Sequence, residues 1–168
     1  GKVADFSKEE AGELYKKLAL GALKYFILKV SPKKSMIFNP EESIDFQGNT
    51  GPFIQFNFVR IQSLLRKQEI GKIDYLHIKL NNEEKELIKE IHKFPQLILS
   101  AAGNYDISEL TSFAYNLAKT YSKFYANTSI LIDTDDNTKF FRLQLSKWTG
   151  DLLKTSFGIL GIEMPDRM

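Results

Sequence analysis

Cysteine is absent from the 168 residues of this sequence, and so are the signals of secreted and membrane proteins. Without cysteine the chain can form neither a disulfide framework nor a thiolate metal site, which fits a reducing compartment and favours a cytoplasmic protein. No apolar run approaches the roughly 20 residues that cross a bilayer, and the first residues show neither a signal-peptide core nor a transit-peptide bias. We therefore expect a soluble protein without a membrane partner.

Histidine is scarce as well, and the other candidates for catalytic or metal chemistry are weak. His77 and His92 each lack a partner at the spacing of metal ligands. Asp133, Asp135 and Asp136 lack the glycine and the distal glutamate of a calcium loop, so a solvated turn is the better interpretation. No nucleophile elbow, phosphate loop or dinucleotide fingerprint occurs. The sequence thus predicts no catalytic residue, no metal site and no cofactor within this chain.

Charge is nearly balanced. Lys and Arg number 23 and Asp and Glu 21, and the net charge of +2 is too small to indicate nucleic-acid binding by itself. A phosphate-binding surface would therefore have to come from local clustering. With 43% hydrophobic and 12% aromatic residues, however, the chain can bury a core of ordinary size.

Apolar residues recur at helical spacing along most of the chain, which predicts an all-α fold, a helical bundle. The expected helices run from Ser7 to about Val30, from near Gly51 to about Lys67, from Asn81 or Asn82 to Phe94, from Pro95 to Gly103, from Asp106 to Tyr125, and from after Asn137 to Gly158 or Gly161. Capping boxes are expected at Ser7 with Glu10 and at Asp106 with Glu109.

Three segments carry more specific expectations. Leu76, Ile78 and Leu80 alternate with polar residues, which predicts a short extended segment lying on the core. The apolar patch at 130–132 is expected to fold back onto the body from a polar loop. The buried face expected for the last helix consists of Phe141, Leu145, Trp148, Leu152 and Ile159.

The helix from Pro52 to Lys67 divides its residues between two directions. Its core seam is expected to consist of Ile54, Phe58, Ile61 and Leu65. Phe53, Phe56, Asn57 and Arg60 face another way. One interpretation is a wholly buried helix with Arg60 reaching to solvent; the other is a stacking platform with a cation for unpaired RNA bases. Composition does not choose between them.

A resemblance does favour one of them. The string QGNTGPFIQFNFVRIQSLLRK resembles the segment that opens the anticodon-binding domain of arginyl-tRNA synthetases, and its order and spacing match. The strings GALKYFIL and MIFNPEESIDF resemble the end of that family's catalytic body, and FAYNLAKTYSKFY and LGIEMPDRM its last helices and tail. The resemblance implies two parts: residues 1–46 as a remnant of the region that links the catalytic body to the next domain, and residues 47–168 as a helical anticodon-binding domain of the DALR type.

The family implies an activity for a longer protein. Its members are class I enzymes that use ATP and Mg to activate arginine and attach it to its tRNA, but their HIGH and KMSKS motifs are absent from this sequence. We therefore expect a C-terminal fragment that is inactive alone, with tRNA and the remainder of the synthetase chain as partners and no DNA. The alternative from another class is a helical protein-interaction module without RNA specificity.

The resemblance also implies which residues surround the anticodon, whose middle cytosine is a main identity element in the family. Phe53 and Phe56 take the places of two tyrosines, so their rings can still stack but the hydroxyl groups are missing. Tyr125 takes the place of a tyrosine, although packing into the core at a helix end would also explain it. The complete set expected to bind RNA is Phe53, Phe56, Asn57, Arg60, Tyr125, Arg167 and Met168.

Overall fold

The computed structural model describes residues 6–132 and 135–168, so residues 1–5 of the expected N-terminal part and Asp133 of the expected turn lie outside the described residues. The helices are α1 (Lys8–Leu28), α2 (Pro40–Ser43), α3 (Gly51–Leu65), the 3-10 turn η2 (Tyr75–His77), α4 (Asn82–His92), α5 (Phe94–Asn104), α6 (Ser108–Asn127) and α7 (Asp136–Ile159). Over these ranges there is no strand, and the predicted all-α fold is confirmed. None of the described helices is both long and apolar enough to span a bilayer.

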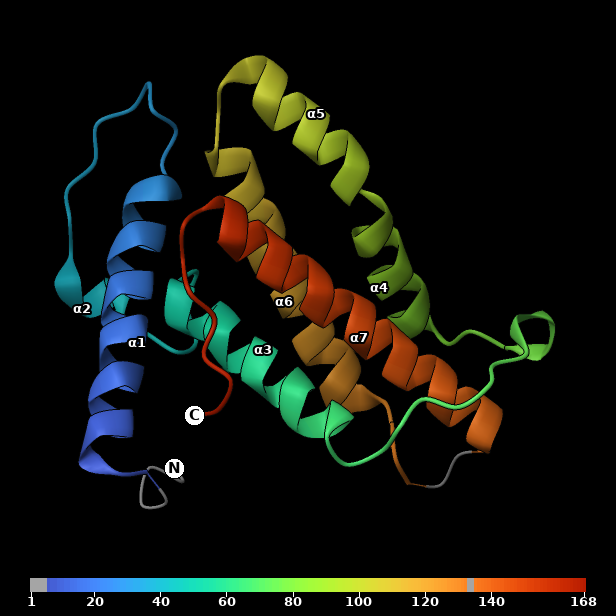
Figure 1. The fold of residues 1–168 in the computed structure, drawn as a ribbon. Helices are drawn as coiled ribbons and strands as arrows, with labels where there is room; N and C mark the ends of the chain where they lie inside the picture. The colour runs from blue at the N-terminus through green and yellow to red at the C-terminus, as the bar shows by residue number, and fades with distance from the viewer. Residues whose placement is uncertain (1–5, 133–134) are drawn as a thin grey trace.

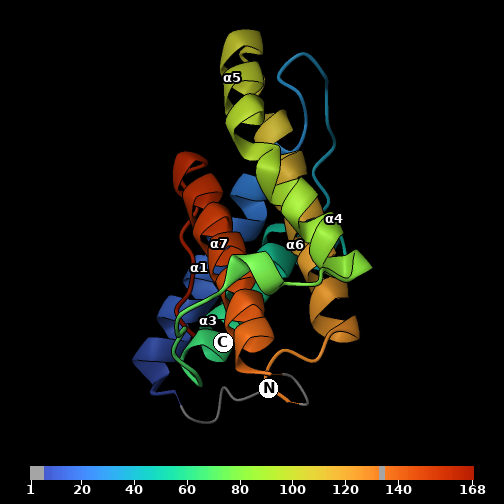
Figure 2. The same cartoon turned by 90° about the vertical axis from the view of Figure 1, so that its right-hand side faces the viewer.

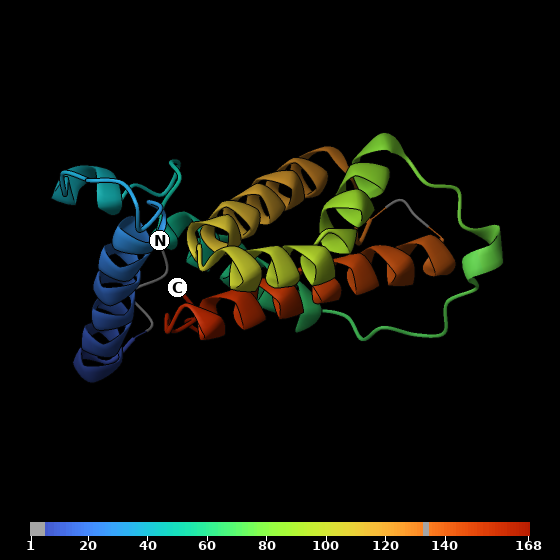
Figure 3. The same cartoon turned by 90° about the horizontal axis from the view of Figure 1, so that it is seen from above.

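The arrangement centres on three helices. α3, α6 and α7 pack on one another, with α4 and α5 covering α6 on one side and α1 covering α3 on the other (Figure 1). Seen at right angles, α5 follows α4 after a bend (Figure 2). From above, the segment between α3 and α4 forms a wide arc beyond the start of α7 (Figure 3). One continuous core joins these helices; its completely buried side chains include Tyr25, Ile54, Ile61, Leu117, Tyr121, Phe124, Leu145, Leu153 and Phe157.

Local capping explains where three of the helices begin. Ser7 and Glu10 form the predicted capping box of α1, since each side chain bonds to the other's backbone N–H. Asn81 and Glu84 form a second one at α4. α3 follows Thr50, whose hydroxyl accepts the N–H of Phe53 at 3.3 Å.

Two helix ends differ from the sequence-based expectation. The helix expected to close at Gly103 continues to Asn104, and Tyr105 takes the left-handed conformation with φ 52°. The capping box expected at Asp106 is wrong, because Asp106 instead accepts the backbone N–H and the hydroxyl of Ser108, two residues on. These two bonds, together with one from Ser31, hold the pKa of the Asp106 carboxyl below its usual value.

The extended segment expected at residues 76–80 is only partly present. Asp74 accepts the backbone N–H of Leu76 and closes a 3-10 turn, which leaves Leu76 92% exposed. Ile78 and Leu80 are partly buried against the core, as expected. Alternation of apolar residues could not reveal the turn, since it depends on the side-chain bond of Asp74.

The buried face of α7 also differs from the predicted one. Trp148 and Ile159 are exposed by 39% and 53%. Small residues lie in the interface in their place, since Thr149 and Gly150 are buried and a methyl group added at Gly150 would lie 3.0 Å from Ile61 Cγ2. Hydrophobic periodicity missed this face because it gives small polar residues no weight.

α1 and α3 approach each other so closely that no side chain fits between them at one point. A Cβ atom added to Gly51 would lie 2.6 Å from the carbonyl oxygen of Gly21. Nearby, the hydroxyl of the buried Tyr25 lies between two acceptors and shares its proton with them, at 2.6 Å from Asn49 Oδ1 and 3.0 Å from the Thr111 carbonyl oxygen. α1 is thereby fixed to both α3 and α6.

This contact generates a stability prediction. Gly51→Ala is expected to lower the free energy of unfolding by about 1–3 kcal/mol, because the new methyl group meets a backbone carbonyl that cannot rotate away. Urea denaturation followed by circular dichroism measures the change.

Gly12→Ala is the matched control, since an alanine Cβ at this exposed position of α1 would meet no described atom within 4 Å. It should raise the free energy of unfolding by about 0.5–1 kcal/mol through helix propensity. Equal effects of the two substitutions would contradict a tight contact at Gly51.

Candidate functional site

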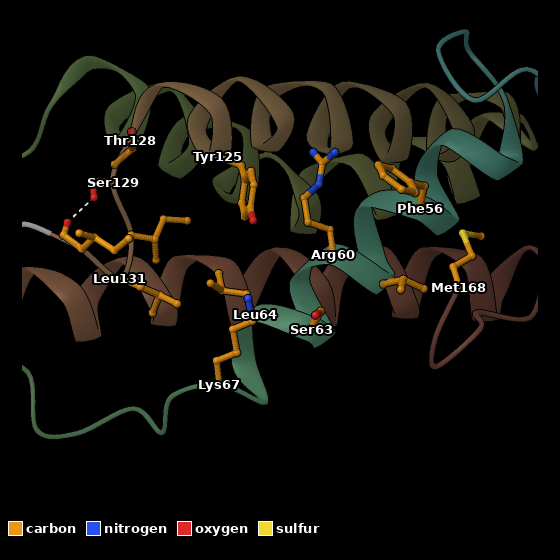
Figure 4. A pocket seen from close by; sticks show the side chains of 13 residues that line it. Phe56, Arg60, Ser63, Leu64, Lys67, Tyr125, Thr128, Ser129, Leu131 and Met168 are labelled. Atoms are coloured by element: carbon orange, nitrogen blue, oxygen red, sulfur yellow. Dashed lines mark hydrogen bonds between the residues drawn. The ribbon is translucent and has the colours of Figure 1, made fainter. Parts of the chain in front are cut away.

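An open groove with a volume of about 520 Å³ lies between α3, the end of α6 and the segment 128–132. Four of the residues expected to bind RNA line this groove: Phe56, Arg60, Tyr125 and Met168 (Figure 4). We call this hollow the α3–α6 groove; its other lining residues are Val59, Ser63, Leu64, Lys67 and 128–132.

Arg60 is held between two aromatic rings. Its guanidinium carbon lies 4.7 Å from the centre of the Phe56 ring and 5.0 Å from that of Tyr125. A cation within about 6 Å of a ring face is attracted by the ring quadrupole. Phe56 and Tyr125 are 40% and 38% exposed. The three groups therefore form an ordered row with aromatic surface open to solvent.

The side chain of Asn57 is hydrogen-bonded to Arg60 on its buried side. It is completely buried, and its Oδ1 accepts the Ser122 hydroxyl at 2.7 Å and Arg60 Nη1 at 3.4 Å. Its Nδ2 donates to the carbonyl of Phe53 at 2.9 Å. From the sequence, Asn57 was expected to contact RNA directly, which would need an exposed side chain. The buried side chain of Asn57 instead orients Arg60.

Tyr125 rests on a buried aromatic neighbour. Its ring centre lies 6.2 Å from that of Tyr121, which is completely buried and donates its hydroxyl to Ser146. Burial raises the pKa of Tyr121 well above its ordinary value. Tyr125 is therefore neither a core residue nor a free surface side chain.

The far wall of the groove is the segment 128–132, and an ion pair tethers it. Arg142 Nη1 donates to the carbonyl of Ser129 at 2.6 Å, while Arg142 Nε pairs with Glu84 at 2.7 Å. Glu84 is 1% exposed. Ile130 is buried and Leu131 packs partly on the core, so the expected fold-back of this patch holds for two of its three residues; Ile132 is 69% exposed.

Phe53 and Arg167 lie away from the row. Phe53 packs on Tyr115, with ring centres 5.6 Å apart, one turn before Phe56. Arg167 pairs with Glu10 at 2.5 Å and lies over the ring of Phe6, so it does not line the groove. Ser122 and Arg142, which position the groove's walls, were not identified from the sequence, because only the fold brings them to their partners.

Charge is unevenly distributed along the two segments of the sequence that contribute α3 and most of α6. Residues 51–67 carry Arg60, Arg66 and Lys67, and residues 110–132 carry Lys119 and Lys123; neither segment contains Asp or Glu. Since these five cations belong to a chain of net charge +2, the remaining residues together carry −3. Lys119 and Lys123 form no ion pair with any part of the chain that the structure describes.

Metal ligands are not gathered at the groove or elsewhere in residues 6–132 and 135–168, where no three His, Asp or Glu side chains come together. Asp135 caps the start of α7 by accepting the N–H of Thr138 at 3.0 Å. This bond lowers the pKa of its carboxyl. The arrangement at the groove suits stacking and charge pairing.

Comparison with known proteins identifies the fold and the family. The family model described as the DALR anticodon binding domain matches residues 54–168. Over its whole length the chain is 52% identical to an arginine–tRNA ligase of Flavobacterium psychrophilum and 45% identical to one of Phocaeicola vulgatus. The chain spans only 28% of the length of each of these relatives.

Solved structures show the same likeness. A Thermus thermophilus arginyl-tRNA synthetase superimposes with a TM-score of 0.89 at 28% identity, over 99% of this chain and 29% of that one. A Plasmodium falciparum arginyl-tRNA synthetase superimposes with a TM-score of 0.81 at 30% identity, over 93% of this chain and 28% of that one. The family resemblance predicted from the sequence is confirmed.

The buried amide beneath Arg60 can be tested by stability. Asn57→Ala is expected to lower the free energy of unfolding by about 1–3 kcal/mol, because it removes a completely buried amide that bonds Ser122, Arg60 and the Phe53 carbonyl. Chemical denaturation of Asn57→Ala, Ser122→Ala and the double variant measures the coupling.

The double variant should lose less stability than the two single variants added together, since either substitution already breaks the shared bond. Strict additivity would show that the two side chains do not interact.

Proposed function

This chain belongs to the DALR anticodon binding domain family, and we propose that it binds the anticodon arm of arginine tRNA as the C-terminal part of an arginyl-tRNA synthetase. The observation that carries the proposal is Arg60 held between the exposed rings of Phe56 and Tyr125 in an open groove. The family match favours this function over a protein-interaction module.

The groove's chemistry suits an unpaired base. Single-stranded bases are recognised by stacking on aromatic rings and on guanidinium planes, with hydrogen bonds along their exposed edges. Phe56 offers a ring without a hydroxyl group, so it stacks but cannot read a base edge. Tyr125 has a hydroxyl group, and the backbone of 128–132 adds donors and acceptors. Discrimination between bases is therefore assigned to Tyr125 and this segment rather than to the two phenylalanines.

The catalytic steps would belong to the rest of such an enzyme. ATP-dependent attachment of arginine to tRNA needs ATP and Mg, and the described residues of this chain bring together no set of ligands that fits the metal. We assign both to the remainder of the synthetase chain and expect this chain alone to show no aminoacylation. Its place would be the cytoplasm, which the absence of cysteine suits.

The row of stacked groups gives the first binding prediction. Arg60→Ala and Tyr125→Ala should each weaken binding of arginine tRNA by about 1–3 kcal/mol, because each removes one stacking surface and, for Arg60, a cation. Filter binding with labelled tRNA measures the dissociation constants, and circular dichroism shows whether each variant is folded.

Lys147→Ala and Tyr75→Ala are the matched controls. Lys147 is an exposed cation of α7, and Tyr75 is an exposed tyrosine of η2; neither lines the groove. They should bind as the unchanged chain does. Undiminished affinity in folded Arg60→Ala and Tyr125→Ala would refute the site.

The cations of α6 give a second prediction. If Lys119 and Lys123 meet phosphates of the bound arm, their joint replacement by Ala should reduce the slope of log affinity against log salt by about 1.4–1.8, or 0.7–0.9 for each phosphate contact. The slope is measured by binding titrations at salt concentrations from about 50 mM to about 200 mM.

Lys147→Ala with Lys154→Ala on α7 removes the same charge from another helix. This pair should leave the slope nearly unchanged. A slope that is small in the unchanged chain would instead favour the protein-interaction module, for which salt dependence is weak.

A further inference from the structure

After α7, the segment 160–168 runs back past α1 and α3 and brings Met168 to the wall of the α3–α6 groove (Figure 1). Side chains of α1 and α3 hold this segment by its backbone. Three of them donate hydrogen bonds to its carbonyl groups: Lys24 to Gly161, Gln55 to Glu163 and Arg66 to Asp166. The path of the segment therefore depends on residues that lie outside it.

Gln55 is the completely buried member of this set of donors. Its Nε2 donates to the Glu163 carbonyl at 2.8 Å and lies 3.3 Å from the carbonyl oxygen of Lys17 on α1. A bond from a buried amide is strong because water does not compete for either partner. One side chain of α3 thus joins α1 and the segment 160–168.

Gly21 provides the space in which this amide lies. A Cβ atom added to Gly21 would be 2.6 Å from Gln55 Nε2 and 2.9 Å from Gln55 Oε1. Real Cβ atoms essentially never come so close to another atom, so a side chain at residue 21 would push the amide from its place. Gly21 therefore serves the bonds of Gln55 as well as the approach of α1 to α3.

The last residues of the segment are held less firmly than its first half. Leu160, Ile162 and Pro165 are buried, whereas residues 166 and 167 are exposed. The ion pair of Arg167 with Glu10 is half-exposed, and such pairs stabilise little because water competes with them. An extended chain covers about 3.3 Å per residue, so the five residues after Glu163 could reach roughly 17 Å. A segment loosened at Glu163 could thus carry residue 168 out of the groove.

We propose that Gln55 is a positioning residue for RNA binding, which keeps Met168 in the wall of the α3–α6 groove through its bond to the Glu163 carbonyl. This inference rests on the proposed function, because the groove must hold RNA for the position of Met168 to matter. Gln55 is completely buried and acts only through the segment. It directly precedes Phe56, so neighbouring residues of α3 supply one wall of the groove and the support for another.

A double-variant cycle tests the proposal. Arginine tRNA is bound to Gln55→Met, Met168→Ala and the double variant, each checked for folding by circular dichroism. Gln55→Met keeps a side chain of similar size but removes the donor, and it should weaken binding about three- to tenfold, the order of one hydrogen bond. Because Gln55 acts through Met168, the double variant should bind no more weakly than Met168→Ala alone.

A fluorescent label reports the position of residue 168 in the absence of RNA. Since the chain contains no cysteine, Met168→Cys gives a single site for a thiol-reactive dye. Gln55→Met in this labelled chain should lower the anisotropy of the dye, because the end of the segment moves more freely. An amide that only stabilised the fold would leave the anisotropy of the folded chain unchanged.

Gly21→Ala keeps the test valid if Gln55→Met does not fold. It leaves the amide in the chain but displaces it, so it should also lower the anisotropy and weaken binding. Gln62→Met is the matched control, because it makes the same chemical change on α3 at a residue that lies beside Gly150 of α7 and does not line the groove. It should leave the anisotropy and the affinity as they are in the unchanged chain.

The outcomes separate this inference from the function on which it rests. Additive losses of affinity in the double variant, or an anisotropy that Gln55→Met and Gly21→Ala both leave unchanged, overturn the positioning role while the proposed function stands. An unchanged chain that binds no arginine tRNA overturns both.

Discussion

The groove depends on one hydrogen bond to a buried amide, which the half-buried hydroxyl of Ser122 on α6 donates to the amide oxygen of Asn57 on α3. A buried polar group without a partner costs about 1–3 kcal/mol, so this bond, together with the core packing of Ile54 and Ile61, favours one rotation of α3 about its own axis. At that rotation Ile54 and Ile61 lie in the core, and Phe56 and Arg60 reach the surface. A helix turned by one residue would bury the guanidinium.

The starts of α1 and α3 were predictable because they depend on neighbours in sequence. The capping box of Ser7 and Glu10 begins α1, and the proline in the first turn begins α3. What escaped prediction depends on contacts across the fold. Trp148 faces solvent because Thr149 and Gly150 let α7 approach α3 closely, and no period of hydrophobicity marks small residues as buried.

The same limit applies at the site. Phe56 and Arg60 were singled out by their shared direction on the helix and Tyr125 by the resemblance to a family, and the fold brings the three together. Asn57 was grouped with them because it lies on the same side of an ideal helix, yet a partner on α6 buries it completely. Arg142 carried no signal at all, since its role arises only where 128–132 returns to α7 beside Glu84.

The close contact of Gly21 and Gly51 has a mechanical consequence. Where two helix backbones lie this close without side chains between them, no further approach is possible and few side chains can take up a change in their angle. We therefore expect α1 and α3 to move together as one rigid unit. In a longer chain, a segment joined to α1 would be held at a set distance and angle from α3 and from any ligand in the α3–α6 groove.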